Sequence, residues 1–140
     1  MKISTKGRYA LRLMLELASD NSGHPKSIKD IAASQAISEK YLEQIISMLN
    51  KAGMVKSIRG AQGGYVLTRE PKEYTVGMIF RVTEGDLAPV KCVGDGEEAC
   101  ERKAGCVSAL LYEKINDAVN NVVDTTTLED LVEWQAGIKK

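Results

Sequence analysis

The stretch from Ser27 to Val66 constrains the fold of this chain more than any other part of it. Two short helices joined by a tight turn are predicted here, because Ser27 and Ser38 each stand where a hydroxyl would cap a helix N-terminus. The second helix is amphipathic, and Gly53 ends it. Its apolar stripe consists of Tyr41, Leu42, Ile45, Met48 and Leu49. Two such helices in this order are typical of a helix-turn-helix.

A β-hairpin is predicted directly after these helices. Two runs rich in β-branched residues, Val55 to Ile58 and Tyr65 to Leu67, are separated by a glycine-rich tip at residues 60–64. A hairpin at this point is the wing of a winged helix. The expected fold is therefore mainly α with a small β-hairpin wing: a winged helix-turn-helix followed by a long C-terminal dimerisation helix.

The charge of the chain is unevenly distributed. The net charge is zero, yet residues 1–70 contain eleven Lys or Arg against six Asp or Glu, whereas the remainder contains eight against thirteen. The basic half coincides with the helix-turn-helix, and a basic face is what a nucleic-acid binder needs. The residues therefore predict a protein that binds double-stranded DNA.

The candidate DNA contacts lie on the second helix of the motif and on the hairpin. The N-terminal residues of a recognition helix face base edges in the major groove. Gln44 suits adenine, Glu43 suits cytosine, and Lys40 suits guanine or a phosphate. Arg59 stands at a thin glycine-rich tip of the kind that enters a minor groove. The full predicted set is Ser38, Lys40, Tyr41, Glu43, Gln44, Arg59, Gln62, Gly63 and Tyr65.

Three parts are expected along the chain: a winged helix-turn-helix over residues 1–83, a cysteine-bearing loop over residues 84–106, and a dimerisation helix with a last short helix over residues 107–140. Helices are predicted from Ser4 to Ala18, from Thr75 to Thr83 and from Val107 to Asp124. A last helix, capped by Thr126 with Glu129, should run to Trp134. The apolar stripe of the 107–124 helix is wide enough to need a second copy of itself as partner. Its candidate dimer contacts are Leu111, Ile115, Ala118 and Val122.

Cys92, Cys100 and Cys106 lie within fifteen residues of one another in an acidic loop. The chain shows neither a signal-peptide core nor a membrane-length apolar run, so a cytoplasmic protein with reduced thiols is expected. Three such cysteines suggest metal ligands or redox groups. Seven and five residues separate them, which suits a bulky iron–sulfur cluster better than zinc. A bare thiol or disulfide sensor stays open as an alternative. No catalytic constellation is present, and no enzyme is predicted.

Four segments identify a resemblance: Met1 to Ala10, Tyr41 to Gln44, Ser57 to Tyr65 and Thr126 to Leu131. Together they resemble the Rrf-type winged-helix regulators over nearly the whole chain. The resemblance implies a homodimer with crossed long helices on a pseudo-palindromic operator. It also implies that Glu43, Gln44 and Arg59 occupy DNA-contacting positions.

The cysteines discriminate among branches of that family. The N-terminal half resembles the CymR-like branch, whereas three cysteines in this loop resemble the IscR-like branch, which carries an iron–sulfur cluster. The resemblance thus implies a cluster, with the 2Fe-2S form favoured over 4Fe-4S. Ala109 occupies the position of the IscR-like fourth ligand, a histidine, so that ligand stays unassigned. The alternative is a cluster-free regulator of cysteine metabolism, controlled by a partner protein or by thiol oxidation.

Overall fold

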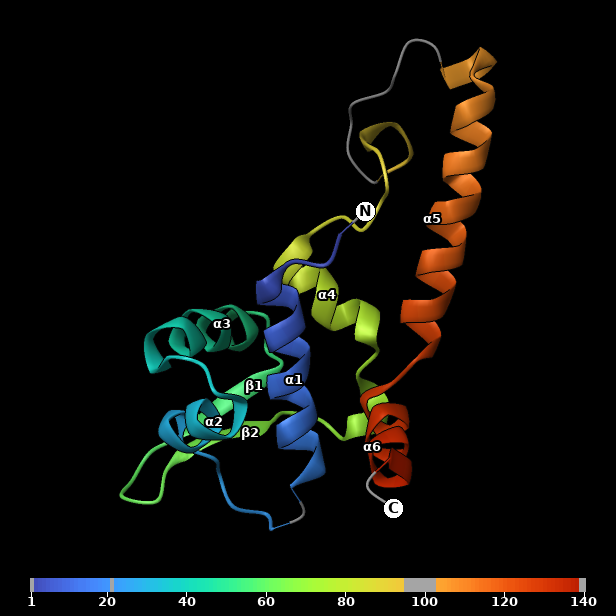
Figure 1. The fold of residues 1–140 in the computed structure, drawn as a ribbon. Coiled ribbons are helices and arrows are strands. Elements are labelled where there is room, and N and C mark those ends of the chain that lie inside the picture. The colour runs from blue at the N-terminus through green and yellow to red at the C-terminus, as the bar shows by residue number, and fades with distance from the viewer. Residues whose placement is uncertain (1, 21, 95–102, 139–140) are drawn as a thin grey trace.

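The computed structural model describes residues 2–20, 22–94 and 103–138. The sequence prediction of a winged helix-turn-helix is confirmed (Figure 1). The helices and strands are α1 (Thr5–Ser19), α2 (Ile28–Gln35), α3 (Glu39–Lys51), β1 (Val55–Ile58), β2 (Gly64–Leu67), α4 (Val76–Glu84), α5 (Val107–Thr125) and α6 (Leu128–Ile138), with 3-10 turns η1 (Pro71–Glu73), η2 (Lys91–Val93) and η3 (Lys103–Gly105).

Helix α1 runs through the middle of the molecule, and α2, α3, α4 and α6 all pack against it (Figure 1). Its residues Ala10, Leu13 and Met14 are fully buried. They share one core with apolar side chains of α2 and α3, which the helical periodicity had placed on the inner faces of those helices. The core therefore sits between α1 and the helix-turn-helix.

Both serine caps of the helix-turn-helix are confirmed. The Ser27 hydroxyl accepts a hydrogen bond from the Asp30 amide at 3.1 Å, and the Ser38 hydroxyl accepts one from the Tyr41 amide at the same distance. Between the two helices Ala36 adopts a left-handed conformation with φ of 56°, which makes the turn tight. The angle between α2 and α3 thus depends on a strained residue as well as on the caps.

The hairpin pairs β1 with β2 antiparallel, with Val55 opposite Leu67 and Ile58 opposite Gly64. Lys26, which precedes α2, adds a bridge to the outer side of β2 by exchanging two backbone hydrogen bonds with Tyr65 (3.1 and 2.8 Å). A Cβ atom on Gly64 would lie 2.2 Å from the Lys26 carbonyl oxygen, so only glycine allows this approach. The hairpin is consequently anchored to the start of the helix-turn-helix.

Tyr74 ties the base of the hairpin to the rest of the fold. Its side chain is fully buried, and its hydroxyl donates to the Met54 carbonyl at 2.7 Å. The same hydroxyl accepts from the Thr68 and Arg69 amides at 3.0 and 3.1 Å. One oxygen atom thus joins the segments that enter and leave the hairpin.

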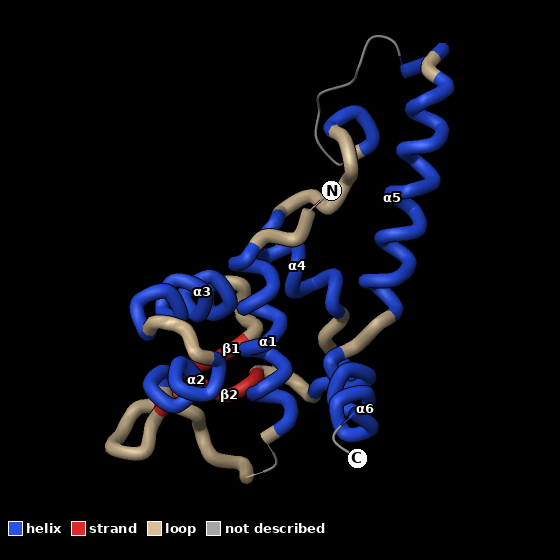
Figure 2. The backbone as a smooth tube through the Cα atoms, in the orientation of Figure 1, coloured by secondary structure: helices blue, strands red, loops and turns tan. Residues whose placement is uncertain are grey.

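Helix α5 stands away from the body, and its C-terminal part is the part that contacts α4 (Figure 2). Arg81 of α4 donates two hydrogen bonds to Asp124, at 2.5 and 3.0 Å, and one to Asn120 at 2.9 Å. Three groups on two helices thereby hold the direction in which α5 leaves the winged helix. No helix in the described ranges is both long enough and apolar enough to cross a membrane.

Two expectations about the C-terminal half are corrected. The segment after α4 is not wholly irregular, because η2 and η3 form 3-10 turns within it. The last helix is capped one residue later than predicted. Thr127, rather than Thr126, exchanges hydrogen bonds with Asp130, and the helix continues past Trp134 to Ile138.

Candidate nucleic-acid interface and cysteine-bearing segment

Helix α3 separates its side chains into two faces. Leu42, Ile45, Ile46 and Leu49 are buried and hold the helix to the core. The opposite face exposes the three predicted base-reading side chains, Lys40, Glu43 and Gln44, together with the cap residue Ser38. These exposed groups offer donors and acceptors of the kinds that base edges and phosphates require.

Tyr41 and Tyr65 occupy a different environment from the other predicted contacts. Both are half-buried and pack against the core. The ring of Tyr41 meets that of Tyr9 edge to face, with centroids 6.0 Å apart, and the Arg12 guanidinium carbon lies 5.2 Å from the Tyr9 centroid. Tyr41 therefore braces α3 against α1, and this bracing was not visible in the sequence.

The tip of the hairpin carries Arg59 and Gln62, both exposed. Gly60 has φ of +127°, and the Gly63 amide donates to the Gly60 carbonyl at 3.0 Å, which closes the turn. A Cβ on Gly63 would lie 2.2 Å from the Ile58 carbonyl oxygen. Glycine is therefore required by the turn itself, and a thin tip that presents an arginine results.

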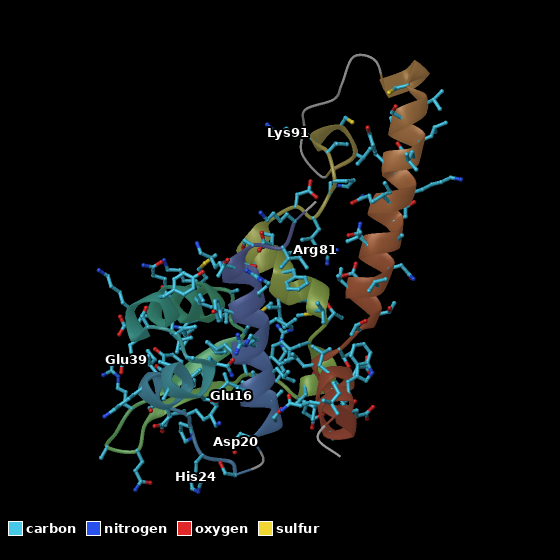
Figure 3. The ribbon with its side chains drawn as sticks, in the orientation of Figure 1. Glu16, Asp20, His24, Glu39, Arg81 and Lys91 are labelled. Atoms are coloured by element: carbon cyan, nitrogen blue, oxygen red, sulfur yellow. The ribbon has the colours of Figure 1, made fainter. Side chains whose placement is uncertain are left out.

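Helix α3 and the hairpin tip lie on the side of the molecule away from α5 (Figure 1). Glu39, at the start of α3, projects outward on this side, whereas Arg81 points between α4 and α5 (Figure 3). Both parts of the predicted DNA surface can thus face one duplex.

Helix α5 exposes large apolar side chains. Val107, Leu110, Leu111, Ile115 and Val122 keep 80%, 61%, 56%, 37% and 61% of their accessible surface, and Ala118 is also exposed. Apolar residues at this spacing on an otherwise solvated helix mark an interaction surface. All four predicted dimer contacts lie in this exposed set.

Two of the three cysteines fall within the described residues, and both are half-buried free thiols. Cys92 lies in η2, which packs against α5, where Asn116 Nδ2 donates to the Val93 carbonyl at 3.4 Å. Cys106 is the N-cap residue of α5. Cys100 lies outside the described residues. Within the described ranges no three His, Cys, Asp or Glu side chains form a metal-binding group.

Residues that sequence reasoning missed connect this segment to the winged helix. Glu84, at the end of α4, accepts hydrogen bonds from both the amide and the hydroxyl of Ser4, the N-cap residue of α1. Hydrogen bonds from Arg81 lower the pKa of Asp124 below its ordinary value. Each pair joins residues at least 43 positions apart, so no local signal could have revealed it.

Comparison with known proteins places these features in one family. Residues 3–134 match the sequence model of the Rrf2 family, described as an iron-dependent transcriptional regulator. The chain is 51% identical to the HTH-type transcriptional regulator CymR of Bacillus subtilis, over 98% of this chain and 94% of that protein.

Solved structures agree with the sequence comparison. The structure of CymR, described as the global cysteine regulator of B. subtilis, matches with a TM-score of 0.79 and 49% identity, covering 96% of this chain and 98% of that one. The IscR structure from T. potens matches with a TM-score of 0.77 and 41% identity, covering 95% and 87%. These relatives are transcriptional regulators and not enzymes, and this chain shares their winged helix with an exposed polar α3. The protein therefore belongs to the Rrf2 family of DNA-binding transcriptional regulators.

Proposed function

We propose that this regulator binds a pseudo-palindromic operator as a homodimer, reading bases with the exposed face of α3 and entering the minor groove with the hairpin tip. The observation that carries the proposal is the exposure of Lys40, Glu43 and Gln44 on α3 and of Arg59 on the hairpin. Helix α3 and the hairpin tip lie on the same side of the molecule (Figure 1). A dimer presents two such surfaces, and a two-fold operator matches them.

The dimer is proposed to form through α5. Its exposed apolar stripe includes Leu111, Ile115, Ala118 and Val122, which lie at helical spacing. Burying this stripe against its copy in the partner removes apolar surface from water, which stabilises the dimer by about 25 cal/mol for each Å² buried. The same contact would set the separation of the two recognition helices.

Footprinting of the operator tests this surface. Gln44→Ala should relax base preference more than it lowers non-specific affinity, and Arg59→Ala should cost about 1–3 kcal/mol at its site. Lys72→Ala provides a control, because Lys72 is an exposed cation in η1, outside α3 and the hairpin. If both variants footprint like the Lys72→Ala control, the assignment of α3 and the hairpin tip is wrong.

We infer that Cys92, Cys100 and Cys106 hold an iron–sulfur cluster, a 2Fe-2S cluster in preference to 4Fe-4S, that tunes operator affinity. The half-buried, free thiols of Cys92 and Cys106 on either side of the acidic loop support this, since thiolates are the usual ligands of such clusters. The cluster would supply redox chemistry, while the chain contributes thiolates and the link from η2 and α5 to α4. Genes of iron–sulfur assembly or of cysteine and sulfur metabolism are the expected targets.

A second function is favoured by the 51% identity to CymR. In it the chain is a cluster-free regulator of cysteine metabolism, controlled by a partner protein or by thiol oxidation. Purification without oxygen, followed by iron, sulfide and visible absorption measurements, separates the two. If the wild type contains iron and sulfide and each Cys→Ala variant loses them, the cluster is supported. A colourless wild-type protein without iron contradicts it.

A further inference from the structure

Helix α5 is joined to the winged helix where its last turns meet α4. Val123 of α5 shares a buried apolar cluster with Val76 and Phe80 of α4. Apolar burial holds the two helices together, but the hydrophobic effect has no preferred direction. The angle between α4 and α5 therefore depends strongly on the polar contacts beside this cluster.

Arg81 of α4 makes those polar contacts. Its guanidinium donates to both carboxylate oxygens of Asp124, at 2.5 and 3.0 Å, and to Asn120 Oδ1 at 2.9 Å. The two acceptors lie one turn apart on α5, so one planar group opposes both rotation of α5 about its axis and sliding along α4. We call Arg81, Asn120 and Asp124 the α4–α5 clamp. A Cβ atom on Gly77 would lie 2.2 Å from Asp124 Oδ1 and 2.6 Å from Arg81 Nη1, so the clamp closes directly over a residue without a side chain.

The clamp and the exposed apolar stripe occupy different faces of α5. At 3.6 residues per turn, Asn120 and Asp124 lie roughly 160° around the helix from the middle of the stripe. One face of α5 is thus held by its own winged helix, while the other is free to pair with a second copy in the proposed dimer. The clamp consequently lies between the proposed DNA surface and the proposed dimer contact.

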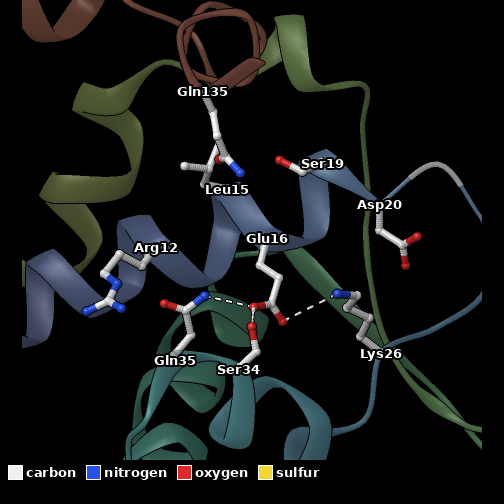
Figure 4. Close-up of a pocket in the computed structure, with 9 residues that line it drawn as sticks. All are labelled: Arg12, Leu15, Glu16, Ser19, Asp20, Lys26, Ser34, Gln35 and Gln135. Atoms are coloured by element: carbon white, nitrogen blue, oxygen red, sulfur yellow. Dashed lines mark hydrogen bonds and ion pairs between the residues drawn. The ribbon is translucent and has the colours of Figure 1, made fainter. Parts of the chain in front are cut away.

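Contacts within the winged helix hold its own helices in a fixed relation. Glu84, at the end of α4, accepts hydrogen bonds from the amide and the hydroxyl of Ser4, the N-cap residue of α1. Glu16 of α1, beside a cavity of about 510 Å³, accepts hydrogen bonds from Ser34 Oγ at 2.5 Å and Gln35 Nε2 at 2.7 Å, near the end of α2 (Figure 4). Helices α2 and α4 are both tied to α1 in this way. The junction of α4 and α5 is therefore the place where a winged helix could change its direction relative to the dimer contact.

The length of α5 makes a small change at this junction large at the dimer contact. Leu111 lies thirteen residues before Asp124, which is about 20 Å along the helix axis. A change of about 10° at the clamp moves that point by about 3 Å, close to the roughly 3.4 Å between successive base pairs. Both protomers of a two-fold dimer change together, so the separation of the two recognition helices responds to each change twice.

We propose that Arg81, Asn120 and Asp124 are positioning residues that determine which half-site spacing the operator must have, by fixing the angle between α4 and α5. This inference rests on the proposed dimer through α5, and it adds a determinant of operator choice that lies outside the base-reading face of α3. With the clamp closed, one separation of the recognition helices predominates. With the clamp open, other angles become more populated, so operators of other spacings bind at less cost.

Binding to operators of three spacings tests the proposal. An operator selected from random duplexes is the parent, and two further duplexes have one base pair removed or added between unchanged half-sites. The wild type should bind the parent at least about tenfold more tightly than either altered duplex. Arg81→Lys keeps the charge but loses the planar fork, so this ratio should fall at least about threefold. Asn120→Ala should also lower the ratio. The Arg81 and Asp124 side chains are partly exposed, so opening the clamp leaves the core intact.

Gly77→Ala reaches the clamp by a second route, because a methyl group there displaces the ends of two side chains, and it should lower the ratio without changing any charge. Asp117→Asn is the matched control and should keep the wild-type ratio. Asp117 is an exposed carboxylate two turns before Asp124, on the same face of α5.

A wild-type ratio in both Arg81→Lys and Gly77→Ala overturns the proposal, and so does a wild type that binds all three spacings equally. A clamp variant that loses the same affinity for every spacing overturns it too, because the clamp would then support the fold and not the spacing. Affinity for a single half-site and sedimentation velocity are measured on the same samples. They distinguish these failures from failure of the proposed DNA surface or of the proposed dimer.

Discussion

Tyr74→Phe tests how the hairpin is held. The substitution keeps the buried ring and removes only the hydroxyl, which donates to the Met54 carbonyl and accepts from the Thr68 and Arg69 amides. The cavity left behind is small, so lost packing contributes little. The loss of hydrogen bonds should therefore dominate the change in the free energy of unfolding.

The size of the loss in the free energy of unfolding depends on which hydrogen-bond partners of the Tyr74 hydroxyl water can reach. Thr68 and Arg69 are exposed, so water replaces the hydroxyl as acceptor for their amides at little cost. Met54 keeps 7% of its surface, and its carbonyl would keep only the Thr68 amide, at 3.4 Å, as a donor. The loss of one hydrogen bond of this kind costs about 0.5–1.5 kcal/mol. We expect a loss of this size, out of a total stability of roughly 5–15 kcal/mol for a domain of this kind.

Urea unfolding at one fixed protein concentration measures this loss, because the stability of a dimer depends on concentration. Tyr9→Phe is the control, because the Tyr9 hydroxyl makes no hydrogen bond within the described ranges. The free energy of unfolding of this variant should differ from that of the wild type by less than about 0.5 kcal/mol. The Tyr74 variant should also bind the operator more weakly, since its hairpin base is loosened. Equal unfolding midpoints for the two variants would refute the role assigned to this hydroxyl.

Three further predictions concern α5, α4 and the hairpin. Ile115→Asp should dissociate the dimer, because it places an unpaired charge in the proposed interface, and sedimentation velocity should then show monomers. The hydrogen bonds from Arg81 depress the pKa of Asp124, so the stability they add is present above the ordinary value of 3.8 and is lost as pH falls through the lower folded value. Asp124→Asn removes this contribution at every pH. The difference in the free energy of unfolding between the wild type and the variant should therefore shrink as the pH is lowered. Gly64→Ala should destabilise the protein by about 1–3 kcal/mol in thermal unfolding, because its Cβ would meet the Lys26 carbonyl at 2.2 Å.

Local chemistry explains why much of the fold could be predicted. The caps at Ser27 and Ser38 depend on a hydroxyl and an amide three residues apart, and both formed as predicted. The hairpin followed from glycines whose backbone the turn requires, at Gly60 and Gly63. Periodicity alone placed the buried side of α3. These features arise within a few residues, so a single sequence contains them.

The capping of α6 shows where local chemistry becomes ambiguous. Three consecutive threonines, 125–127, offer equivalent hydroxyls, and the prediction chose the wrong one. Thr127 becomes the cap because it forms a bridge with Thr75, and the Leu128 amide donates to the Tyr74 carbonyl at 3.0 Å. Contacts with a segment some fifty residues earlier thus selected among local alternatives.

The sequence by itself determined the helices, the hairpin and the polar face of α3, because each depends on neighbours along the chain. Only the tertiary structure decided what Glu16 does. In sequence it is one more charged residue of an amphipathic helix, and in the fold it meets Ser34, Gln35 and Lys26 beside a cavity. Those partners come from segments ten or more residues away, brought together by the packing of α1 against α2. A carboxylate acquires its surroundings from that packing, and no pattern of neighbouring residues encodes it.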